Sequence, residues 1–301
     1  MGILIKDISY YLPEKKLDNH FFEQYLDTSD EWIVKRTGIK SRHFSESGVA
    51  EMAVHCAKEL CRKNAVDNIK LIVACSFTDR QRMPSVSASI ANACKLFGEI
   101  RAFDINLACS GFVAGLDMAE NFLNVGEQAI VVGSEQISHF LDMQDRGTCI
   151  LFGDGAGAVL VEKTDSPSPT SFGLVEDKHY LCMNENEKIQ MDGREVFKFA
   201  VGVLKANIAE MLPYHPQYIV CHQANERIID HVSHALKIAP EKFYKNLNEV
   251  GNTSAASIPL CLAKMKENHC FPEKTAILLC GFGAGLTYYN KLVEIECHDE
   301  F

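Results

Sequence analysis

Residues 102–123 read AFDINLACSGFVAGLDMAENFL, an apolar run, a cysteine among small residues, and then an amphipathic segment. AFDIN is typical of a strand, and FVAGLDMAENFL has the spacing of a helix. Cys109 therefore lies at a strand-to-helix turn, where free backbone N–H groups and the helix dipole favour a thiolate. The pattern predicts a nucleophile at neutral pH. The alternative, a small residue that packs helix against sheet, stays open on this segment alone.

The same alternation of strand and helix extends along the chain. Apolar runs at LIVACSF (71–77), AIVVGS (129–134) and AGAVLVE (156–162) are separated by helical patterns such as EMAVHCAKELCRKN (51–64). This arrangement predicts an α/β protein with buried strands. The chain has 301 residues, so two domains, or two fused halves that share one core, are expected.

A boundary is predicted in KTDSPSPTS (163–171), where Ser, Thr and Pro cluster and neither period continues. It divides the chain into an N-terminal half, residues 1–163, and a C-terminal half, residues 171–301. The halves resemble each other in three pairs of segments, which suggests an internal duplication. The pairs are LIVACSFT (71–78) with YIVCHQAN (218–225), AIVVGSEQ (129–136) with AILLCGFG (276–283), and PSVSASIANACKLF (84–97) with NTSAASIPLCLAKM (252–265).

Composition excludes several classes of protein. Hydrophobic residues make up 47 % and charged residues 23 %, no apolar run approaches the ~20 residues that cross a bilayer, and MGILIKDISYYLPEKK has no signal-peptide pattern. We therefore expect a cytoplasmic protein without membrane insertion. A net charge of −10 argues against general binding of nucleic acid. The 12 cysteines are dispersed and form no CxxC pair, so reduced core thiols are expected, and metal-ligand spacing is absent.

Two glycine-rich turns invite a nucleotide-binding interpretation that they do not support. GDGAG (153–157) leads into a strand and GFGAG (281–285) lacks the dinucleotide spacing, whereas that fingerprint needs G-x-G-x-x-G between a strand and a helix. Close approach of two backbones, or a tight turn with exposed amides, is the better interpretation.

Two further polar residues occupy turns. His222 ends the apolar run YIVC and precedes a helical pattern, so its imidazole would project into a cleft at a strand end, where ligands bind in α/β sheets. A hydrogen-bonded structural histidine is the alternative. Asn252, in VGNTSAAS, has the position of an N-cap or an Asx-turn, and the residue alone favours that interpretation.

Together these three sites resemble the β-ketoacyl-acyl carrier protein synthase III family of the thiolase superfamily. The resemblance includes ACSGF, HQANERII and GNTSAASIP in that order, and also DTSDEWIVKRTGIKSRHF (27–44), DRGTCILFGDGAGAVLVE (145–162) and GREVFKFAV (193–201). It implies a thiolase-like fold, in which two similar halves form a five-layered α-β-α-β-α sandwich, usually as a homodimer.

The resemblance also implies a decarboxylative Claisen condensation that initiates fatty acid synthesis. Cys109 would be acylated by an acyl-CoA, and His222 and Asn252 would then hold the enolate formed from malonyl-acyl carrier protein. Oxyanion donors are expected at Cys109 and in the turn Phe282, Gly283 and Ala284. The CoA thioester is a substrate, and no cofactor or metal is implied.

Binding roles are implied for further positions. CoA and pantetheine would contact a polar set around the only tryptophan, namely Thr28, Trp32, Arg36, Arg146 and Asn225. Lys198 and Arg227 would dock the acidic carrier protein. Met83 would enter the partner subunit's acyl pocket, where many members have Phe. The segment between Leu160 and Gly193, which normally helps to wall that pocket, is shorter than usual, and Ala284 replaces a glycine of the family's turn.

Other functions remain open on the sequence. A specialised-metabolism ketosynthase or acyltransferase could use the same Cys-His-Asn set, and a non-catalytic partner subunit of a heteromeric synthase is a third possibility. A cysteine hydrolase is less favoured, because its base would have to orient and activate the thiol. Acyl-CoA should label a condensing enzyme stably, a hydrolase only transiently, and an inactive partner not at all.

Overall fold

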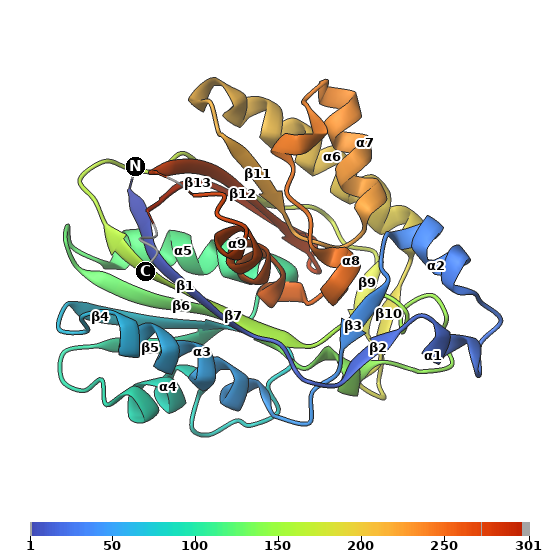
Figure 1. Ribbon diagram of the computed structural model, residues 1–301, viewed down its shortest axis with the longest axis horizontal. Helices are drawn as coiled ribbons and strands as arrows, with labels where there is room; N and C mark the ends of the chain where they lie inside the picture. The colour runs from blue at the N-terminus through green and yellow to red at the C-terminus, as the bar shows by residue number, and fades with distance from the viewer. Residues whose placement is uncertain (1, 272, 297–301) are drawn as a thin grey trace.

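A computed structural model describes residues 2–271 and 273–296. Its main sheet has nine strands in the described part of the chain, in the order β11-β12-β13-β1-β7-β6-β4-β5, with β8 also paired to β13 (Figure 1). The strands are β1 (Ile3–Tyr11), β4 (Ile69–Cys75), β5 (Arg101–Ile105), β6 (Gln128–Glu135), β7 (Gly155–Lys163), β8 (Thr170–Leu174), β11 (Tyr218–Cys221), β12 (Thr275–Gly283) and β13 (Thr287–Ile295).

A short parallel pairing of β1 with β13 joins the strands of the N-terminal half to those of the C-terminal half. Only Leu4 with Glu294 and Ile5 with Ile295 are in register there. The other neighbours pair over longer stretches, such as β1 with β7 from Ile3 to Tyr11. The nine strands therefore form two sheet portions that meet at one narrow seam.

Helices lie on both faces of each portion, and two helices lie between the portions (Figure 1). The outer helices are α3 (Val49–Lys63) and α4 (Val86–Cys94) on the N-terminal side, and α6 (Gly193–Met211) and α7 (Glu226–Leu236) on the C-terminal side. The central pair is α5 (Gly111–Phe122) and α9 (Ser257–Glu267).

Alternation along the strands explains this layering. In β4, Val73 packs in the core that contains α5 and α9, and its neighbour Ile72 packs with α3 and α4. In β12, Leu279 faces the central core and Leu278 faces α6 and α7. Because both faces of both portions are covered, the strands read as continuous apolar runs. The five-layered α-β-α-β-α arrangement is confirmed.

Each central helix is preceded by a 3₁₀ turn that presses on a strand. The turn η1 (Ala108–Ser110) leads into α5, and η5 (Ser254–Ala256) leads into α9. Ala108 has φ 44° and Ser254 has φ 48°, a left-handed conformation that is uncommon outside glycine and is often found at functional sites. A Cβ on Gly133 of β6 would lie 2.2 Å from the Ala255 carbonyl oxygen. The absence of a side chain at Gly133 therefore allows η5 to pack directly on β6.

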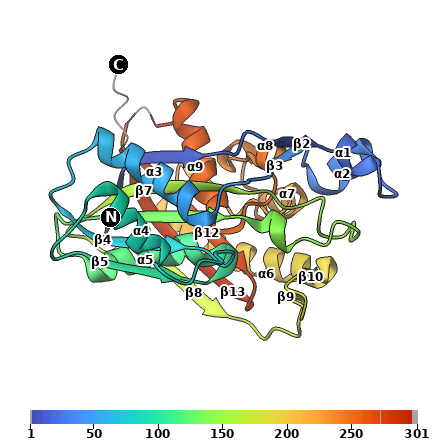
Figure 2. The ribbon, with the colours of Figure 1, turned by 90° about the horizontal axis from the view of Figure 1, so that it is seen from below.

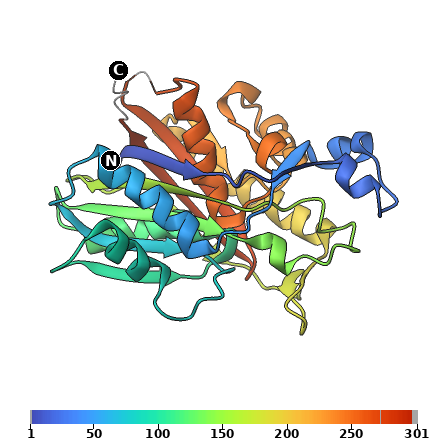
Figure 3. The same cartoon turned by 60° about the horizontal axis from the view of Figure 1, so that its bottom comes forward.

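The remaining small elements gather at one end of the molecule (Figure 2). The blue N-terminal segment with α1 (His20–Glu23) and α2 (Asp30–Thr37) protrudes there (Figure 3). Nearby lie β2 (Lys16–Asp18) with β3 (Ser41–His43), the hairpin of β9 (Leu181–Met183) and β10 (Ile189–Met191), and the short helix α8 (Leu247–Val250). Short turns η2 (Ile137–Phe140), η3 (Leu212–Tyr214) and η4 (Pro240–Lys242) complete the chain.

The division of the chain at residues 163 and 171 stays a prediction. β7 ends at Lys163 and β8 begins at Thr170, so that linker-like segment joins two strands. Of the three pairs of similar segments, the third joins elements in different layers, because α4 covers an outer face and α9 lies at the centre. The central counterpart of α9 is α5. Within residues 2–271 and 273–296, no helix combines the length and apolar character of a membrane span.

Candidate active site

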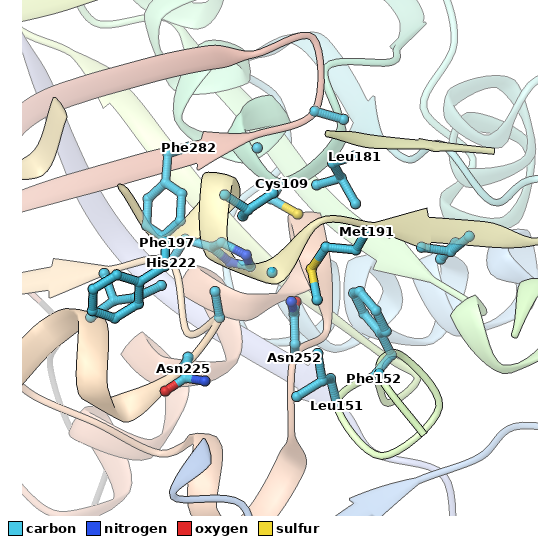
Figure 4. A pocket seen from close by; sticks show the side chains of 18 of the residues that line it. Cys109, Leu151, Phe152, Leu181, Met191, Phe197, His222, Asn225, Asn252 and Phe282 are labelled. Carbon is cyan, nitrogen blue, oxygen red and sulfur yellow. The ribbon is translucent and has the colours of Figure 1, made fainter. Parts of the chain in front are cut away.

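A cavity of about 1060 Å³ lies where the two halves meet, and Cys109, His222 and Asn252 all line it. Each comes from a different element: Cys109 from η1, His222 from the end of β11, and Asn252 from the segment between α8 and η5. Figure 4 shows the Cys109 sulfur, the His222 ring and the Asn252 amide directed into the same space. Tertiary structure therefore brings the three predicted residues together.

Cys109 lies in η1, directly before α5, with 7 % of its surface exposed. Burial raises the pKa of the Cys109 thiol to about 12, against a smaller opposing effect of the Ser254 hydroxyl. A helix N-terminus stabilises an anion by at most about 2 kcal/mol, whereas a rise of this size corresponds to ~4 kcal/mol. Burial therefore outweighs the dipole. Burial thus favours the thiol over the thiolate that the sequence predicts, and the thiol must lose its proton as it reacts.

His222 is a buried, neutral imidazole. Burial lowers the pKa of His222 to about 3. Its ring lies edge-on to Phe282, with the ring centroids 5.1 Å apart, and its Nδ1 has no hydrogen-bond partner within the described residues. At neutral pH such a ring acts as an N–H donor of no net charge and is a weak base.

Asn252 is held in one orientation by its neighbours. Its backbone N–H donates to the Leu151 carbonyl at 2.9 Å, and its own carbonyl accepts from Gly153 N–H at 3.0 Å. Its side-chain Oδ1 accepts from the Ser254 N–H at 3.0 Å. With the oxygen engaged, the Nδ2 group is the free donor of the side chain. Two neutral N–H donors, from His222 and Asn252, can stabilise an anionic oxygen. A cationic side chain would instead bind the substrate carboxylate and oppose its loss as CO₂.

The end of β12 and the residue after it lie against Cys109. Phe282, Gly283 and Ala284 line the cavity, and a Cβ on Gly283 would lie only 3.0 Å from the Cys109 backbone nitrogen. Close approach of two backbones, the interpretation favoured for GFGAG, is what the structure contains. Ala284 retains a backbone N–H, so its replacement of glycine removes no donor.

Apolar side chains line the inner part of the cavity, which suits an acyl chain. They are Phe77, Ile150, Leu151, Phe152, Leu181, Ile189 and Met191. Leu181, Ile189 and Met191 belong to the β9–β10 hairpin, so the segment between Leu160 and Gly193 supplies part of the cavity wall.

Polar residues form the cavity rim. Trp32, Arg36, Arg146 and Asn225 line it, and the Arg146 guanidinium lies 4.7 Å from the Trp32 ring centroid. Trp32 is 40 % exposed, as a surface platform for a flat ring would be. Asn225 caps α7 and donates from Nδ2 to the Arg36 carbonyl at 3.3 Å. Thr28 lies outside the lining residues, and its contact with CoA stays a prediction.

The two predicted docking residues stand at the same rim, and the predicted acyl-pocket residue does not. Lys198 on α6 and Arg227 on α7 are exposed and line the cavity. Lys198 is paired with Glu195, with Nζ and Oε1 2.5 Å apart. Met83 is 86 % exposed and is not among the residues that line this chain's cavity.

Two buried residues at the site were not identified from the sequence. Glu135 at the end of β6 and Ser254 in η5 both affect the pKa of the Cys109 thiol. Glu135 could have been identified as a candidate functional residue, because AIVVGSE places its carboxylate at the end of a buried apolar strand. Ser254 gave no comparable signal. Within the described residues, no group of three or more His, Cys, Asp or Glu side chains could hold a metal ion.

Two family models match the chain. Residues 103–177 match the 3-oxoacyl-[acyl-carrier-protein (ACP)] synthase III model, and residues 208–295 match the model of its C-terminal part. The first contains Cys109, and the second contains His222 and Asn252.

Known proteins resemble the chain over nearly its whole length. A beta-ketoacyl-[acyl-carrier-protein] synthase III of Clostridium botulinum (strain Loch Maree / Type A3) is 38 % identical, with 92 % of this chain and 94 % of the relative covered. The protein of that name from Acholeplasma laidlawii is 39 % identical, with 98 % and 99 % covered. The crystal structure of 3-oxoacyl-[acyl-carrier-protein] synthase III from Aquifex aeolicus VF5 superposes with a TM-score of 0.90 at 36 % identity, with 97 % and 99 % covered.

Proposed function

The chain belongs to the 3-oxoacyl-[acyl-carrier-protein] synthase III family, and we propose that Cys109, His222 and Asn252 carry out its condensation. The protein is a condensing enzyme of the acyltransferase class that joins an acyl-CoA primer to malonyl-acyl carrier protein and so initiates fatty acid synthesis. The observation that carries the residue assignment is the convergence of a buried thiol, a neutral imidazole and an oriented amide on one cavity.

In the first half-reaction, Cys109 takes the acyl group from CoA. The sulfur attacks the thioester carbonyl, and the tetrahedral oxyanion is held by the backbone N–H groups of Cys109 and Ala284. The bond to the CoA sulfur then breaks, and the CoA thiolate accepts a proton as it leaves. The close contact of Gly283 with Cys109 supports this assignment, because it places the two donor segments side by side.

In the second half-reaction, malonyl-acyl carrier protein loses CO₂ and the enolate oxygen is held by His222 N–H and Asn252 Nδ2. The lowered pKa of His222 supports this role, because a cationic ring would stabilise the carboxylate and oppose its loss. The α-carbon then attacks the acyl-Cys109 carbonyl, the bond to sulfur breaks, and a β-ketoacyl thioester is released. No step requires a metal or a redox cofactor.

The substrates enter from the rim. The adenine of CoA would lie between Trp32 and Arg146, which already stack in the free protein, and Arg36, Asn225 and Thr28 would hold the phosphates and pantetheine. Lys198 and Arg227 would attract the acidic carrier protein. Both lie beside the cavity on an otherwise acidic chain.

The same proposal includes a homodimer. β5 ends the strand order, so its outer edge is free to pair within the described part of the chain. Large apolar side chains near that edge are exposed, namely Met83, Phe97 and Phe122. A second copy would cover them and would place Met83 in its partner's acyl pocket.

Relatives that carry the name of the fatty-acid enzyme favour this function over a specialised ketosynthase or a silent partner subunit. The direct test incubates the protein with acyl-CoAs from acetyl to decanoyl and reads the intact mass, with Cys109→Ser as control. One stable acyl adduct on Cys109 is expected. Rapid return to free acid would indicate a hydrolase, and no adduct from any acyl-CoA would contradict the priming step.

A further inference from the structure

We propose that Glu135 and Ser254 form a proton-accepting pair behind Cys109, in which the Ser254 hydroxyl passes the thiol proton to the Glu135 carboxylate during acylation. The proposal rests on the acylation of Cys109 described above. It assigns a role to two buried polar groups that do not line the substrate cavity.

Glu135 is held by one of its two carboxylate oxygens. It is fully buried at the end of β6, and its Oε2 accepts from Ser76 Oγ at 3.0 Å, Phe77 N–H at 3.3 Å and Thr78 N–H at 3.2 Å, as well as from the Thr78 hydroxyl. Its Oε1 is buried and has no hydrogen-bond partner within the described residues. The carboxylate is thus fixed on one side with its second oxygen available.

Ser254 belongs to η5, which packs against both η1, the element of Cys109, and β6, the strand that ends at Glu135. Its Oγ is also buried without a hydrogen-bond partner within the described residues, and its hydroxyl lowers the pKa of both the Cys109 thiol and the Glu135 carboxyl. The contact of η5 with β6 exists because Gly133 has no side chain. The packing of η5 thus brings the Ser254 hydroxyl near enough to affect both Cys109 and Glu135.

The reaction needs an acceptor of this kind. The Cys109 thiol has a pKa of about 12 and His222 a pKa of about 3, so neutral His222 has little affinity for the proton. Burial raises the pKa of Glu135 to about 7, against the hydrogen bonds from Thr78 and Ser76. Glu135 is therefore the stronger base of the two by a wide margin, and near pH 7 a substantial share of it is ionised.

The proton transfer balances. The thiol S–H proton moves to Ser254 Oγ while the Ser254 hydroxyl proton moves to Glu135 Oε1, and the sulfur forms its bond to the acyl carbon. The bond to the CoA sulfur breaks, and the CoA thiolate takes its proton from solvent. The proton held by Glu135 returns through Ser254 to the Cys109 thiolate, which forms when the second half-reaction breaks the acyl bond to sulfur. Among the described residues, the thiols of Cys109 and Cys75 interact with Glu135, whose negative charge raises the pKa of both.

Because the charge of Glu135 raises the pKa of Cys109, its removal has opposite effects under the two possible roles of Glu135. If Glu135 acted only through its charge, Glu135→Gln would lower the pKa of Cys109 and speed its reactions. If Glu135 accepts the proton, the same substitution slows them. The experiment measures the rate of Cys109 alkylation by iodoacetamide and the rate of acylation by acetyl-CoA from pH 5.5 to 9, by intact mass, in the full-length chain.

Both wild-type rates should rise through pH 7 as Glu135 ionises. Glu135→Gln should lose this rise and react ~10²-fold more slowly at pH 7.5, and Glu135→Asp should recover part of it. Ser254→Ala should behave like Glu135→Gln, and the double variant no worse than either, because the pair acts as one unit. Faster alkylation in Glu135→Gln, or an unchanged pH profile, overturns the proposal.

Ser76→Ala is the matched control, because Ser76 binds the carboxylate oxygen that is already engaged. Loss of that hydrogen bond should keep the rise and move its midpoint above pH 7, since the Ser76 hydroxyl lowers the pKa of Glu135. A midpoint that does not move contradicts the assignment of the rise to Glu135. Thermal unfolding of each variant excludes misfolding, and Ser254→Ala tests the pair even if Glu135→Gln does not fold.

Alkylation needs no acyl-CoA, so the two proposals can fail separately. Wild-type protein that is alkylated with the expected pH profile but accepts no acyl-CoA refutes the priming reaction and supports the proton-accepting pair. Wild-type protein that is acylated, with the same pH profile in Glu135→Gln, supports the priming reaction and refutes the pair.

Discussion

A Cβ atom on Gly283 would lie 2.9 Å from the Cβ of Cys109, so the end of β12 and the η1 segment touch only because residue 283 has no side chain. The oxyanion donors proposed above belong to these two segments. Their spacing is therefore set by a backbone contact rather than by a side chain.

We predict that Gly283→Ala displaces Cys109 and lowers its acylation rate by ~10²-fold, since about 1 Å of misplacement costs that much. Gly202→Ala is the matched control, because a Cβ there meets nothing within 4 Å. It should leave acylation unchanged and stabilise helix α6 by about 0.5–1 kcal/mol. Equal acylation rates in the two variants would show that the contact does not position the thiol.

The three cavity residues should separate the half-reactions. Cys109→Ala should abolish acyl transfer, whereas His222→Ala and Asn252→Ala should still be acylated but should lose at least ~10²-fold in malonyl-dependent condensation, as for a lost oxyanion donor. Intact mass follows the first step, and release of β-ketoacyl product follows the second. Equal loss of acylation in all three variants would contradict this division of roles.

Acid should destabilise the protein through His222. Its pKa is about 3 in the folded state and ordinarily 6.5, so below pH 6.5 the unfolded chain binds a proton that the folded chain does not. Stability from the neutral ring is present above pH 6.5 and falls by ~1.4 kcal/mol per pH unit below it. Urea unfolding at pH 7.5 and 5.0 should show wild-type losing ~2 kcal/mol more than His222→Gln. If the wild-type protein and His222→Gln lose the same free energy of unfolding between pH 7.5 and 5.0, the imidazole is solvated in the folded protein.

The fluorescence of Trp32, the only tryptophan in the chain, should change when CoA binds. Displacement of the Arg146 guanidinium by adenine should change the indole fluorescence, and Trp32→Ala should raise KM for acetyl-CoA by about tenfold while kcat changes little. Acetyl-N-acetylcysteamine lacks the nucleotide and is the matched control substrate. A similar rise of KM for both substrates would place the effect of Trp32 elsewhere.

The exposed edge of β5 should carry the dimer contact. Phe122 packs on Phe103 of that strand, with ring centroids 5.5 Å apart, and remains 48 % exposed. We predict a dimer by sedimentation for wild-type protein and a monomer for Phe122→Asp. Phe172→Asp on β8, where the side chain is 60 % exposed, should remain dimeric. A wild-type monomer would refute the proposed assembly.

The sequence by itself determined the α/β class with buried strands, and the family resemblance in its motifs supplied the five layers and the main candidate residues of the site. Continuous apolar runs such as those around Val73 and Leu279 can be buried only on both faces, which favours helices on each side of the strands. The small residues around Cys109 and Asn252 mark turns, and their order along the chain carried the family resemblance. These features are local, so they can be read along the chain.

Tertiary structure alone decided the electrostatics. The position of Cys109 at a helix N-terminus predicts a lowered pKa for its thiol. Burial raises that pKa instead, because loss of solvation outweighs the effect of the dipole. Glu135 and Ser254 come from different halves and become neighbours only because Gly133 lets η5 rest on β6. The resemblance between residues 84–97 and 252–265 pairs an outer helix with a central helix. Apolar spacing indicates that one face of a helix is buried, but it does not indicate the layer in which the helix lies.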